Sequence, residues 1–434
     1  MTVTSNHAFP KERPRPDEHE RVSALGSTQL LRLSTAGSVD DGKSTLIGRL
    51  LYETKSIFED QLEAIDRASR DQGLDRLNLA LLTDGLRAER EQGITIDVAY
   101  RYFSTPRRSF VLADTPGHVE YTRNMVTGAS TVDLTIVLVD ASRGVVEQSR
   151  RHLFLAGLLD VRQVVVCVNK MDLVGYDRAV FEGIHDELAP FIDRLGLSDV
   201  RFIPISALEG DNVVDRSANM LWYDGAPLLD LLETVPIGRD RADAPARLPV
   251  QWVTWTGSYR GYAGQIAGGR LRTGDEIVVL PSGRRSRVAT IDTFDGPLDE
   301  AVEGQSVTVT LADAVDVSRG DLIAAAAALP AVASELEADL CWFGSTPLRI
   351  GGRYALKHTT RSTRAIVQEL RWRVDVNTLA EQPGEALAMN EIGRVRIKTA
   401  QPLAYDPYRL DRVTGGFILI DEGTNETVAA GMLR

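Results

Sequence analysis

Short apolar runs alternate with longer polar stretches in the first half of the chain. The runs cover residues 31–36, 109–113, 133–140, 164–168 and 202–205. Buried strands that alternate with helical patterns are typical of a parallel sheet with helices on both faces. We therefore expect a doubly wound, mostly parallel α/β domain over residues 29–238. The charged, proline-broken segment 1–28 is expected to be a disordered tail.

The periodicity changes after a charged linker at residues 239–245. Short runs of period two follow, separated by glycine-rich turns, first over residues 247–330 and then over 334–434. Regularly spaced strands with such turns are typical of small closed barrels. The pattern thus predicts a β-barrel domain at 247–330 and allows a second one at 334–434.

A phosphate-binding motif, G-x-x-x-x-G-K-[ST], follows the first apolar run directly. It consists of Gly37, Ser38, Val39, Asp40, Asp41, Gly42, Lys43 and Ser44, with Thr45 next in the chain. In such a loop the glycines let backbone N–H groups surround a phosphate, the lysine reaches the β- and γ-phosphates, and the serine hydroxyl reaches Mg²⁺. A glycine turn without a ligand is the alternative, and chance alone rarely produces the full pattern. The loop therefore predicts a P-loop nucleotide-binding domain.

Two further motifs close later apolar runs in the order found in guanine-nucleotide sites. Asp114 can hold Mg²⁺ through water, and the Gly117 N–H can contact the γ-phosphate. In the motif Asn169-Lys170-Met171-Asp172, the Asp172 carboxylate can accept two hydrogen bonds from guanine, while the Lys170 stem lies across the base. Adenine would leave this carboxylate unpaired, so the site selects GTP.

A fourth motif, Ser206-Ala207-Leu208, is placed to offer a backbone N–H to the guanine O6. Three residues of this kind also fit an ordinary strand-to-loop turn. The guanine-binding interpretation of this motif is therefore supported only by its position after the other three motifs in the chain. Together the four motifs describe the carboxyl-end rim of one sheet.

The segment Gly93-Ile94-Thr95-Ile96 resembles the first switch of translation-factor GTPases. By this resemblance Thr95 ligates Mg²⁺ when the γ-phosphate is present. Val39 and Ile94 look like the apolar pair that flanks the catalytic histidine in that class, so His118 would orient the attacking water. Thr95, His118 and Lys43 are then the expected catalytic residues, although an ordinary surface histidine is the alternative reading of His118.

Other stretches are similar to a narrower family, the GTPase subunits of bacterial sulfate adenylyltransferase (ATP sulfurylase). Ser38 and Asp41 stand where translation factors commonly have histidines. The stretches that carry the likeness are residues 37–51, 84–93, 210–214, 374–379, 390–395 and 416–421. The resemblance covers about residues 30–432 and implies two β-barrels behind the GTPase domain.

This resemblance also implies a function and a partner. GTP hydrolysis here would be coupled to formation of adenylylsulfate and pyrophosphate, while a smaller catalytic subunit binds ATP and sulfate within a hetero-oligomer. The chain carries a single phosphate loop, so we expect neither adenylyl transfer nor adenylylsulfate kinase activity on this polypeptide. Two alternatives remain, a translational GTPase that delivers aminoacyl-tRNA and a non-catalytic GTP-binding scaffold.

Composition limits the kinds of partner and the cellular compartment that we expect for this chain. The net charge of −12 disfavours a nucleic-acid partner, and no stretch predicts a leader or a membrane span. Cys167 and Cys341 lie in apolar runs, which suits buried thiols in a reducing cytoplasm.

A basic cluster at Arg353, Lys357, His358, Arg361 and Arg364 predicts a solvated strand face, with a docking surface for an acidic partner as the alternative.

Overall fold

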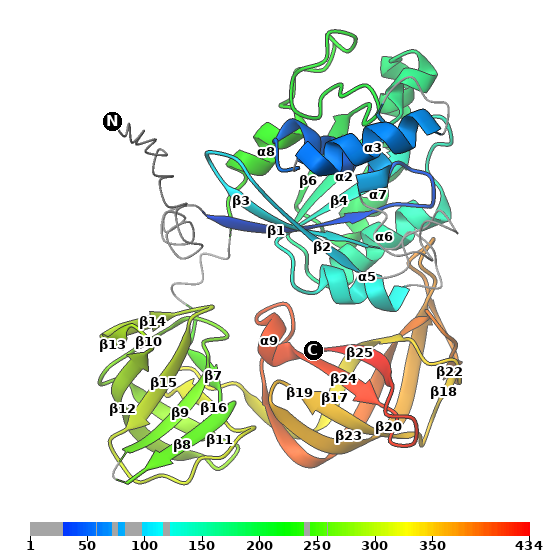
Figure 1. Cartoon of the computed structure of the whole chain (residues 1–434). Helices are drawn as coiled ribbons and strands as arrows, with labels where there is room; N and C mark the ends of the chain where they lie inside the picture. Colours follow the sequence, from blue (N-terminus) through cyan, green and yellow to red (C-terminus); the bar gives the residue numbers. More distant parts are fainter. Residues whose placement is uncertain are drawn as a thin grey trace, which may run out of the picture.

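The computed structural model describes residues 29–57, 59–71, 77–82, 98–115, 122–237, 244–257 and 259–434. The expected tail at 1–28 and most of the linker at 239–245 lie outside these ranges. The described residues form an α/β body and two β-rich bodies, and the amino-terminal half of the chain makes the α/β body (Figure 1).

The α/β body is built on a six-stranded sheet with the order β2-β3-β1-β4-β5-β6. Its strands are β1 (Leu30–Ala36), β2 (Ala99–Ser104), β3 (Ser109–Asp114), β4 (Leu134–Asp140), β5 (Gln163–Asn169) and β6 (Asp199–Pro204). All neighbours are parallel except β2, which pairs antiparallel with β3. This confirms the predicted mostly parallel sheet and adds an edge strand that the apolar pattern did not predict.

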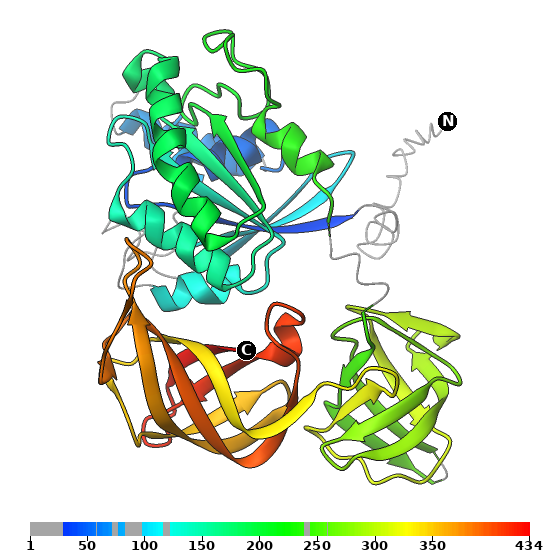
Figure 2. The same ribbon diagram turned by 180° about the vertical axis from the view of Figure 1, so that it is seen from behind.

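Helices cover both faces of this sheet (Figures 1 and 2). They are α2 (Lys43–Glu53), α3 (Glu59–Asp71), η1 (Leu79–Leu82), α5 (Thr122–Ala129), α6 (Glu147–Leu158), η3 (Met171–Val174), α7 (Arg178–Leu195) and α8 (Leu228–Thr234). Strand β4 is buried along its whole length because it faces two cores. Ile136 and Leu138 pack in the core beneath α2 and α8, whereas Val137 and Val139 pack in the core beneath α5, α6 and α7.

The first β-rich body comprises β7 (Arg247–Pro249), β8 (Trp252–Thr256), β9 (Tyr259–Gln265), β10 (Arg270–Arg272), β11 (Glu276–Leu280), β12 (Arg284–Thr293), β13 (Gly296–Leu298), β14 (Glu300–Val302), β15 (Ser306–Leu311) and β16 (Leu322–Ala325). Its main sheet runs β7-β16-β11-β12-β15-β9-β8. Arg247 of β7 exchanges backbone hydrogen bonds with Ala267 and Gly268, which follow β9, so the two ends of this path are linked. A bridge between Arg247 and Gly268 lies at the junction.

The second β-rich body comprises β17 (Ala331–Trp342), β18 (Leu348–Arg349), β19 (Arg353–His358), β20 (Arg361–Val374), β21 (Glu381–Gln382), β22 (Ala386–Leu387), β23 (Ile392–Tyr405), the short helix α9 (Arg412–Gly415), β24 (Gly416–Ile420) and β25 (Thr427–Leu433). The path β19-β24-β25-β17-β23-β20 is closed by pairing of β19 with β20. The fold class predicted from sequence, an α/β P-loop GTPase-type domain followed by two β-barrels, is confirmed.

The carboxyl-terminal barrel packs directly on the α/β body. Its residues Cys341, Ile392 and Met432 are buried in the same apolar cluster as the inner faces of α6 and α7. At the rim of this contact Arg151 donates from Nη1 to the Asn390 carbonyl at 3.1 Å. An apolar interior that continues from one body into the next joins them more firmly than a polar contact would.

The two barrels are joined by partly buried ion pairs. Arg247 of β7 makes a two-pronged contact with Asp406, with N–O distances of 2.8 Å and 3.0 Å. Arg361 of β20 reaches back to Asp321 of the first barrel at 2.6 Å. Both views show the two barrels side by side (Figures 1 and 2).

Cys167 and Cys341 are buried free thiols, as predicted. The predicted solvated basic face is wrong for His358, which is buried and contacts the Thr414 carbonyl through Nε2 at 2.6 Å, because β19 turns this side chain inward. Within the described ranges, no helix is both long enough and apolar enough to span a membrane.

Candidate nucleotide site

The predicted motifs lie where strands of the α/β body end. Register places Thr35 opposite Asp114 across β1 and β3, and Asp140 opposite Asn169 across β4 and β5, so the carboxyl ends of these strands are level. Strand β1 lies between β3 and β4 and is thus the point where the strand order reverses. Ligands of doubly wound sheets bind at such a point.

The phosphate loop turns from β1 into α2 through three residues with positive φ. These are Gly37 at 155°, Asp40 at 70° and Gly42 at 94°. A Cβ atom on Gly42 would lie 2.4 Å from Asn169 Nδ2. Position 42 therefore needs glycine both for its backbone conformation and for its close approach to β5.

Lys43, the first residue of α2, is buried beneath the loop. Its Nζ donates to the carbonyls of Gly37 and Ser38, each at 2.9 Å. Burial lowers its pKa, and the carboxylates of Asp114, Asp41 and Asp40 act in the opposite direction. The ammonium group is thus held against the backbone of the loop by two of its carbonyls.

The Asp41 side chain folds back into the loop. Its Oδ2 accepts from the Ser38 N–H at 2.7 Å, and burial raises its pKa despite that bond. The hydroxyl of Ser38 is buried and has no hydrogen-bond partner among the described residues. Asp41 is therefore a structural support of the loop, and the Ser38 hydroxyl has spare hydrogen-bonding capacity there.

Asp114 is buried at the end of β3, where its Oδ1 accepts from Thr35 Oγ1 at 3.3 Å. Ser44 and Thr45 lie in the first turn of α2 and are partly exposed. Three further expected site residues, Thr95, Gly117 and His118, fall outside the described residues.

Asn169 connects the phosphate loop to the proposed base motifs. Its Nδ2 donates to the Asp41 carbonyl at 2.8 Å, and its Oδ1 accepts from the Ala207 N–H at 2.9 Å. Asp172 lies beside Ser206, whose Oγ donates to Asp172 Oδ1 at 2.6 Å. Two motifs that are 34 residues apart in the chain thus share one hydrogen bond.

Lys170 has a left-handed backbone, with φ at 63°, and its Nζ lies 2.7 Å from Asp140 Oδ2. Partial burial acts to raise the pKa of Asp140, but bonds from Lys170 and Ser142 outweigh it and lower that pKa. Leu208, the last residue of its motif, is exposed.

Three contributors to this rim were not predicted. Asp140 anchors Lys170, Arg49 donates from Nε to the Ala207 carbonyl at 3.2 Å and also contacts the Leu208 carbonyl, and Arg143 contacts the Val39 carbonyl. Asp140 could have been found, because it ends an apolar run in the same way as Asp114. The two arginines carry no comparable signal in the sequence.

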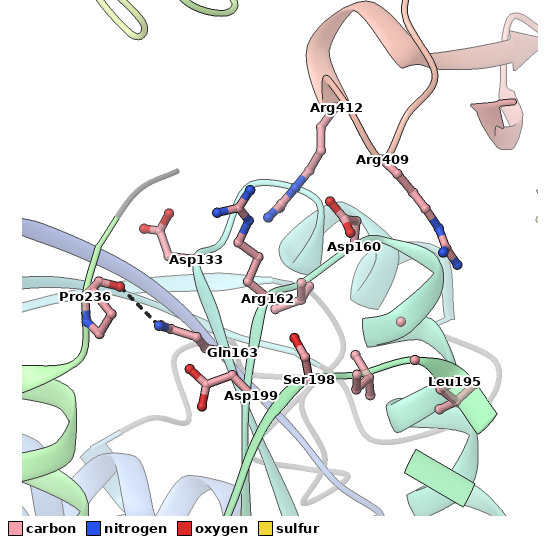
Figure 3. Close-up of a pocket in the computed structure, with 14 residues that line it drawn as sticks. Asp133, Asp160, Arg162, Gln163, Leu195, Ser198, Asp199, Pro236, Arg409 and Arg412 are labelled. Atoms are coloured by element: carbon pink, nitrogen blue, oxygen red, sulfur yellow. Dashed lines mark hydrogen bonds between the residues drawn. The ribbon is translucent and has the colours of Figure 1, made fainter. Parts of the chain in front are cut away.

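A cavity of about 450 Å³ lies elsewhere, between the α/β body and the carboxyl-terminal barrel. Figure 3 shows Asp133, Arg162 and Asp199 around it, with Arg409 and Arg412 entering from the barrel. Arg412 donates to the Val132 carbonyl at 3.0 Å. These α/β residues lie at the amino ends of β4, β5 and β6, so the cavity is on the edge of the sheet opposite the nucleotide motifs.

Comparison with known families agrees with the fold. Residues 28–237 match the Elongation factor Tu GTP binding domain, and residues 335–434 match the GTP-eEF1A C-terminal domain-like family.

Curated relatives resemble the chain over most of its length. A protein of Mycobacterium tuberculosis named bifunctional enzyme CysN/CysC is 54% identical over 413 residues, covering 94% of this chain and 67% of that protein. Sulfate adenylyltransferase subunit 1 of Aeromonas hydrophila is 52% identical over 407 residues, covering 93% and 86%. The subunit 1 of Shewanella woodyi is 49% identical over 421 residues, covering 96% and 90%. The chain therefore belongs to the sulfate adenylyltransferase subunit 1 family, within the superfamily of translation-factor GTPases.

Proposed function

We propose that this chain is the GTP-hydrolysing subunit of a sulfate adenylyltransferase and binds GTP with Mg²⁺ at the carboxyl-end rim of its parallel sheet. The bridging role of Asn169 carries this proposal, because one side chain joins the phosphate loop to the guanine-type motifs. Family membership supports the reaction, and the Elongation factor Tu GTP binding domain supports the nucleotide.

In the proposed complex, Lys43 would exchange the Gly37 and Ser38 carbonyls for oxygens of the β- and γ-phosphates. A buried ammonium beside two neutral acceptors gains more from a charged acceptor, since charge-assisted hydrogen bonds are about twice as strong as neutral ones. Asp172, oriented by Ser206, would accept from the guanine edge, and the Ala207 segment would face O6.

The residues present suit Mg²⁺. Asp114 is 2% exposed, and its carboxylate has Lys43 as a neighbouring charge, so an anionic oxygen is held at the loop. Ser44 and Thr95 would hold the ion through hydroxyl oxygens and Asp114 would hold it through water, an all-oxygen set of the kind that Mg²⁺ prefers. Neutralisation of charge on the β- and γ-phosphates is what the ion supplies when bound.

His118 and the Gly117 N–H complete the proposed chemistry on the strength of the sequence motifs. His118 would orient the attacking water, and Gly117 would contact the γ-phosphate. We also propose that the GTPase domain spans residues 29–238 and that the two barrels span 247–330 and 334–434. The proposed location of the protein is the cytoplasm.

The proposed partner is the smaller catalytic subunit, which would bind ATP and sulfate and carry out adenylyl transfer. Formation of a sulfate–phosphate anhydride is uphill, so GTP hydrolysis on this chain would bias the partner between two states. A full swing of such an equilibrium, from 1:99 to 99:1, needs about 5.5 kcal/mol of differential affinity.

The test mixes the chain with that subunit, ATP, sulfate and Mg²⁺, and measures adenylylsulfate and pyrophosphate with and without GTP. We expect product to depend on GTP and GTP turnover to rise with the partner, while Lys43→Ala loses GTP binding and both effects. GTP turnover that responds to ribosomes and aminoacyl-tRNA but not to the small subunit would instead support a translational GTPase.

A further inference from the structure

We propose that Arg143 is a catalytic arginine supplied by the chain itself, whose guanidinium contacts the γ-phosphate in the transition state of GTP hydrolysis. This inference rests on the proposed GTPase function and adds to it a residue that none of the motifs contains. Arg143 lies in the turn after β4, outside the phosphate loop.

The guanidinium is already at the edge of the phosphate loop. Arg143 Nη1 donates to the Val39 carbonyl at 3.3 Å and lies 4.0 Å from Asp41 Oδ1. The Arg143 side chain is 50% exposed, whereas that of Asp41 is 3% exposed. Both contacts are long, so they hold the guanidinium near the loop without consuming its five donors.

Val39 directly follows the two loop residues that Lys43 contacts, so in the proposed complex it would lie beside the γ-phosphate. Lys43, which reaches the β- and γ-phosphates in such loops, lies against the carbonyls of Gly37 and Ser38. Val39 is the next residue. Arg143, which contacts the Val39 carbonyl, is therefore only one residue away along the loop from the carbonyls that Lys43 contacts.

The backbone that carries Arg143 is fixed. Asp140 accepts from the N–H groups of Arg143 and Gly144 through its carbonyl, at 3.1 Å and 2.9 Å, and from Ser142 Oγ through its carboxylate, at 2.6 Å. The same carboxylate pairs with Lys170 at 2.7 Å. The turn is rigid, but the Arg143 side chain is exposed and weakly held, so the guanidinium can move a short distance at little cost. The Arg143 backbone meanwhile keeps its position relative to Lys170 of the base motif, because Asp140 contacts both.

Such a group accelerates GTP hydrolysis. A water oxygen bonds to the γ-phosphorus, the bond from that phosphorus to the β–γ bridging oxygen breaks, and the electron pair stays on GDP. The protons of the water end on inorganic phosphate and solvent. Arg143 remains protonated throughout and donates hydrogen bonds to oxygens that gain negative charge, an effect worth 10³–10⁵ in kcat in GTPases that use an arginine.

The test compares Arg143→Ala, Arg143→Lys and the parent chain, alone and with the small subunit. Single-turnover GTP hydrolysis is measured, together with the affinity for a fluorescent GTP analogue and for GDP with fluoroaluminate, which imitates the transferring phosphoryl group. Arg150→Ala is the matched control, because Arg150 is a nearby partly exposed arginine that pairs with Glu187 on α7.

We expect Arg143→Ala to slow hydrolysis by about 10²-fold or more and to lose fluoroaluminate-dependent binding, with GTP affinity changed by less than about threefold. Arg143→Lys should keep part of the rate, because it keeps the charge but loses the planar fork. Arg150→Ala should match the parent.

A parental hydrolysis rate in Arg143→Ala would overturn the proposal, and so would equal losses of GTP affinity and rate, which would make Arg143 a support of the loop. Failure of the parent itself to bind GTP would instead overturn the proposed function.

Discussion

Asn169 donates from Nδ2 to the carbonyl of Asp41 at 2.8 Å, which ties the end of β5 to the phosphate loop. The same amide accepts from the Ala207 N–H, so one side chain of the guanine motif fixes both neighbours. Phosphate and base subsites built in this way keep a constant separation, and a nucleotide must match both at once.

The Asp172→Asn variant should change the base that is bound. The amide can still accept from Ser206 Oγ, so the local structure is retained, but it now offers a donor where guanine also presents one. Binding of GTP should fall by at least about 10²-fold and binding of XTP should rise, because the C2 carbonyl of xanthine accepts that donor. Competition of GTP and XTP against a fluorescent nucleotide measures the exchange, and unchanged GTP affinity would remove Asp172 from the base pocket.

Gly42→Ala should abolish nucleotide binding. Its φ of 94° disfavours any side chain, and the new Cβ would lie 2.4 Å from Asn169 Nδ2. Gly196→Ala is the matched control, with φ at 70° and nothing within 4 Å of the added atom. The control should lose only about 1–2 kcal/mol of stability through backbone strain and bind GTP normally. Calorimetric titration with GTP and thermal melts distinguish the two; normal binding by Gly42→Ala would show that the loop can move away from β5.

His152 should make the stability of the chain fall in acid. This ring on α6 is buried, with Nδ1 3.0 Å from Met125 Sδ, and burial together with the charge of Lys43 lowers its pKa to about 3. An unfolded histidine has a pKa near 6.5, so below that pH the unfolded state binds a proton that the folded state excludes. Stability should therefore decrease from about pH 6.5 downward, by about 1.4 kcal/mol per pH unit, and be unaffected by this group above pH 6.5.

Denaturant unfolding of the parent and of His152→Phe at several pH values between 7.5 and 4.5 isolates that contribution. The difference in stability between the two proteins should change with pH only on the acid side of 6.5. His185→Gln, a change at an exposed histidine of α7, serves as the control. Parallel pH curves for the parent and His152→Phe would contradict a neutral buried ring.

Arg247→Ala should loosen the contact between the two barrels. The Arg247 and Asp406 side chains are 4% and 14% exposed, so removal of the guanidinium leaves a carboxylate buried without its counter-charge. We expect a loss of about 3–5 kcal/mol and a lower thermal midpoint. Arg364→Ala removes an ion pair whose arginine is 82% exposed, and it should cost less than about 1 kcal/mol. Similar shifts for both variants would mean that the buried pair is not what holds the barrels.

Much of the fold could be predicted because apolar periodicity is strong where strands are buried. The predicted runs 109–113 and 164–168 lie within β3 and β5. Strand β2 was missed because it is an edge strand whose aromatic residues face outward, with Tyr100 and Tyr102 47% and 71% exposed. A half-exposed edge gives a weak apolar signal.

The candidate site could be predicted only as far as its local motifs extend. Lys43 and Asp172 belong to short patterns whose chemistry is evident from the sequence. The contact of Arg49 with the Leu208 carbonyl joins residues 159 positions apart, and nothing in either neighbourhood announces it. Long-range contacts of this kind depend on how the elements pack and not on local sequence.

The three bodies pack in an order that differs from their order in the chain. The carboxyl-terminal barrel shares an apolar interior with α6 and α7, and the first barrel is clasped to the carboxyl-terminal one through Arg247 and Asp406. The last segment of the chain therefore shares the interior of the nucleotide-binding body, and the middle segment is attached to that last segment through an ion pair. Order along the chain and order of packing thus differ in this protein.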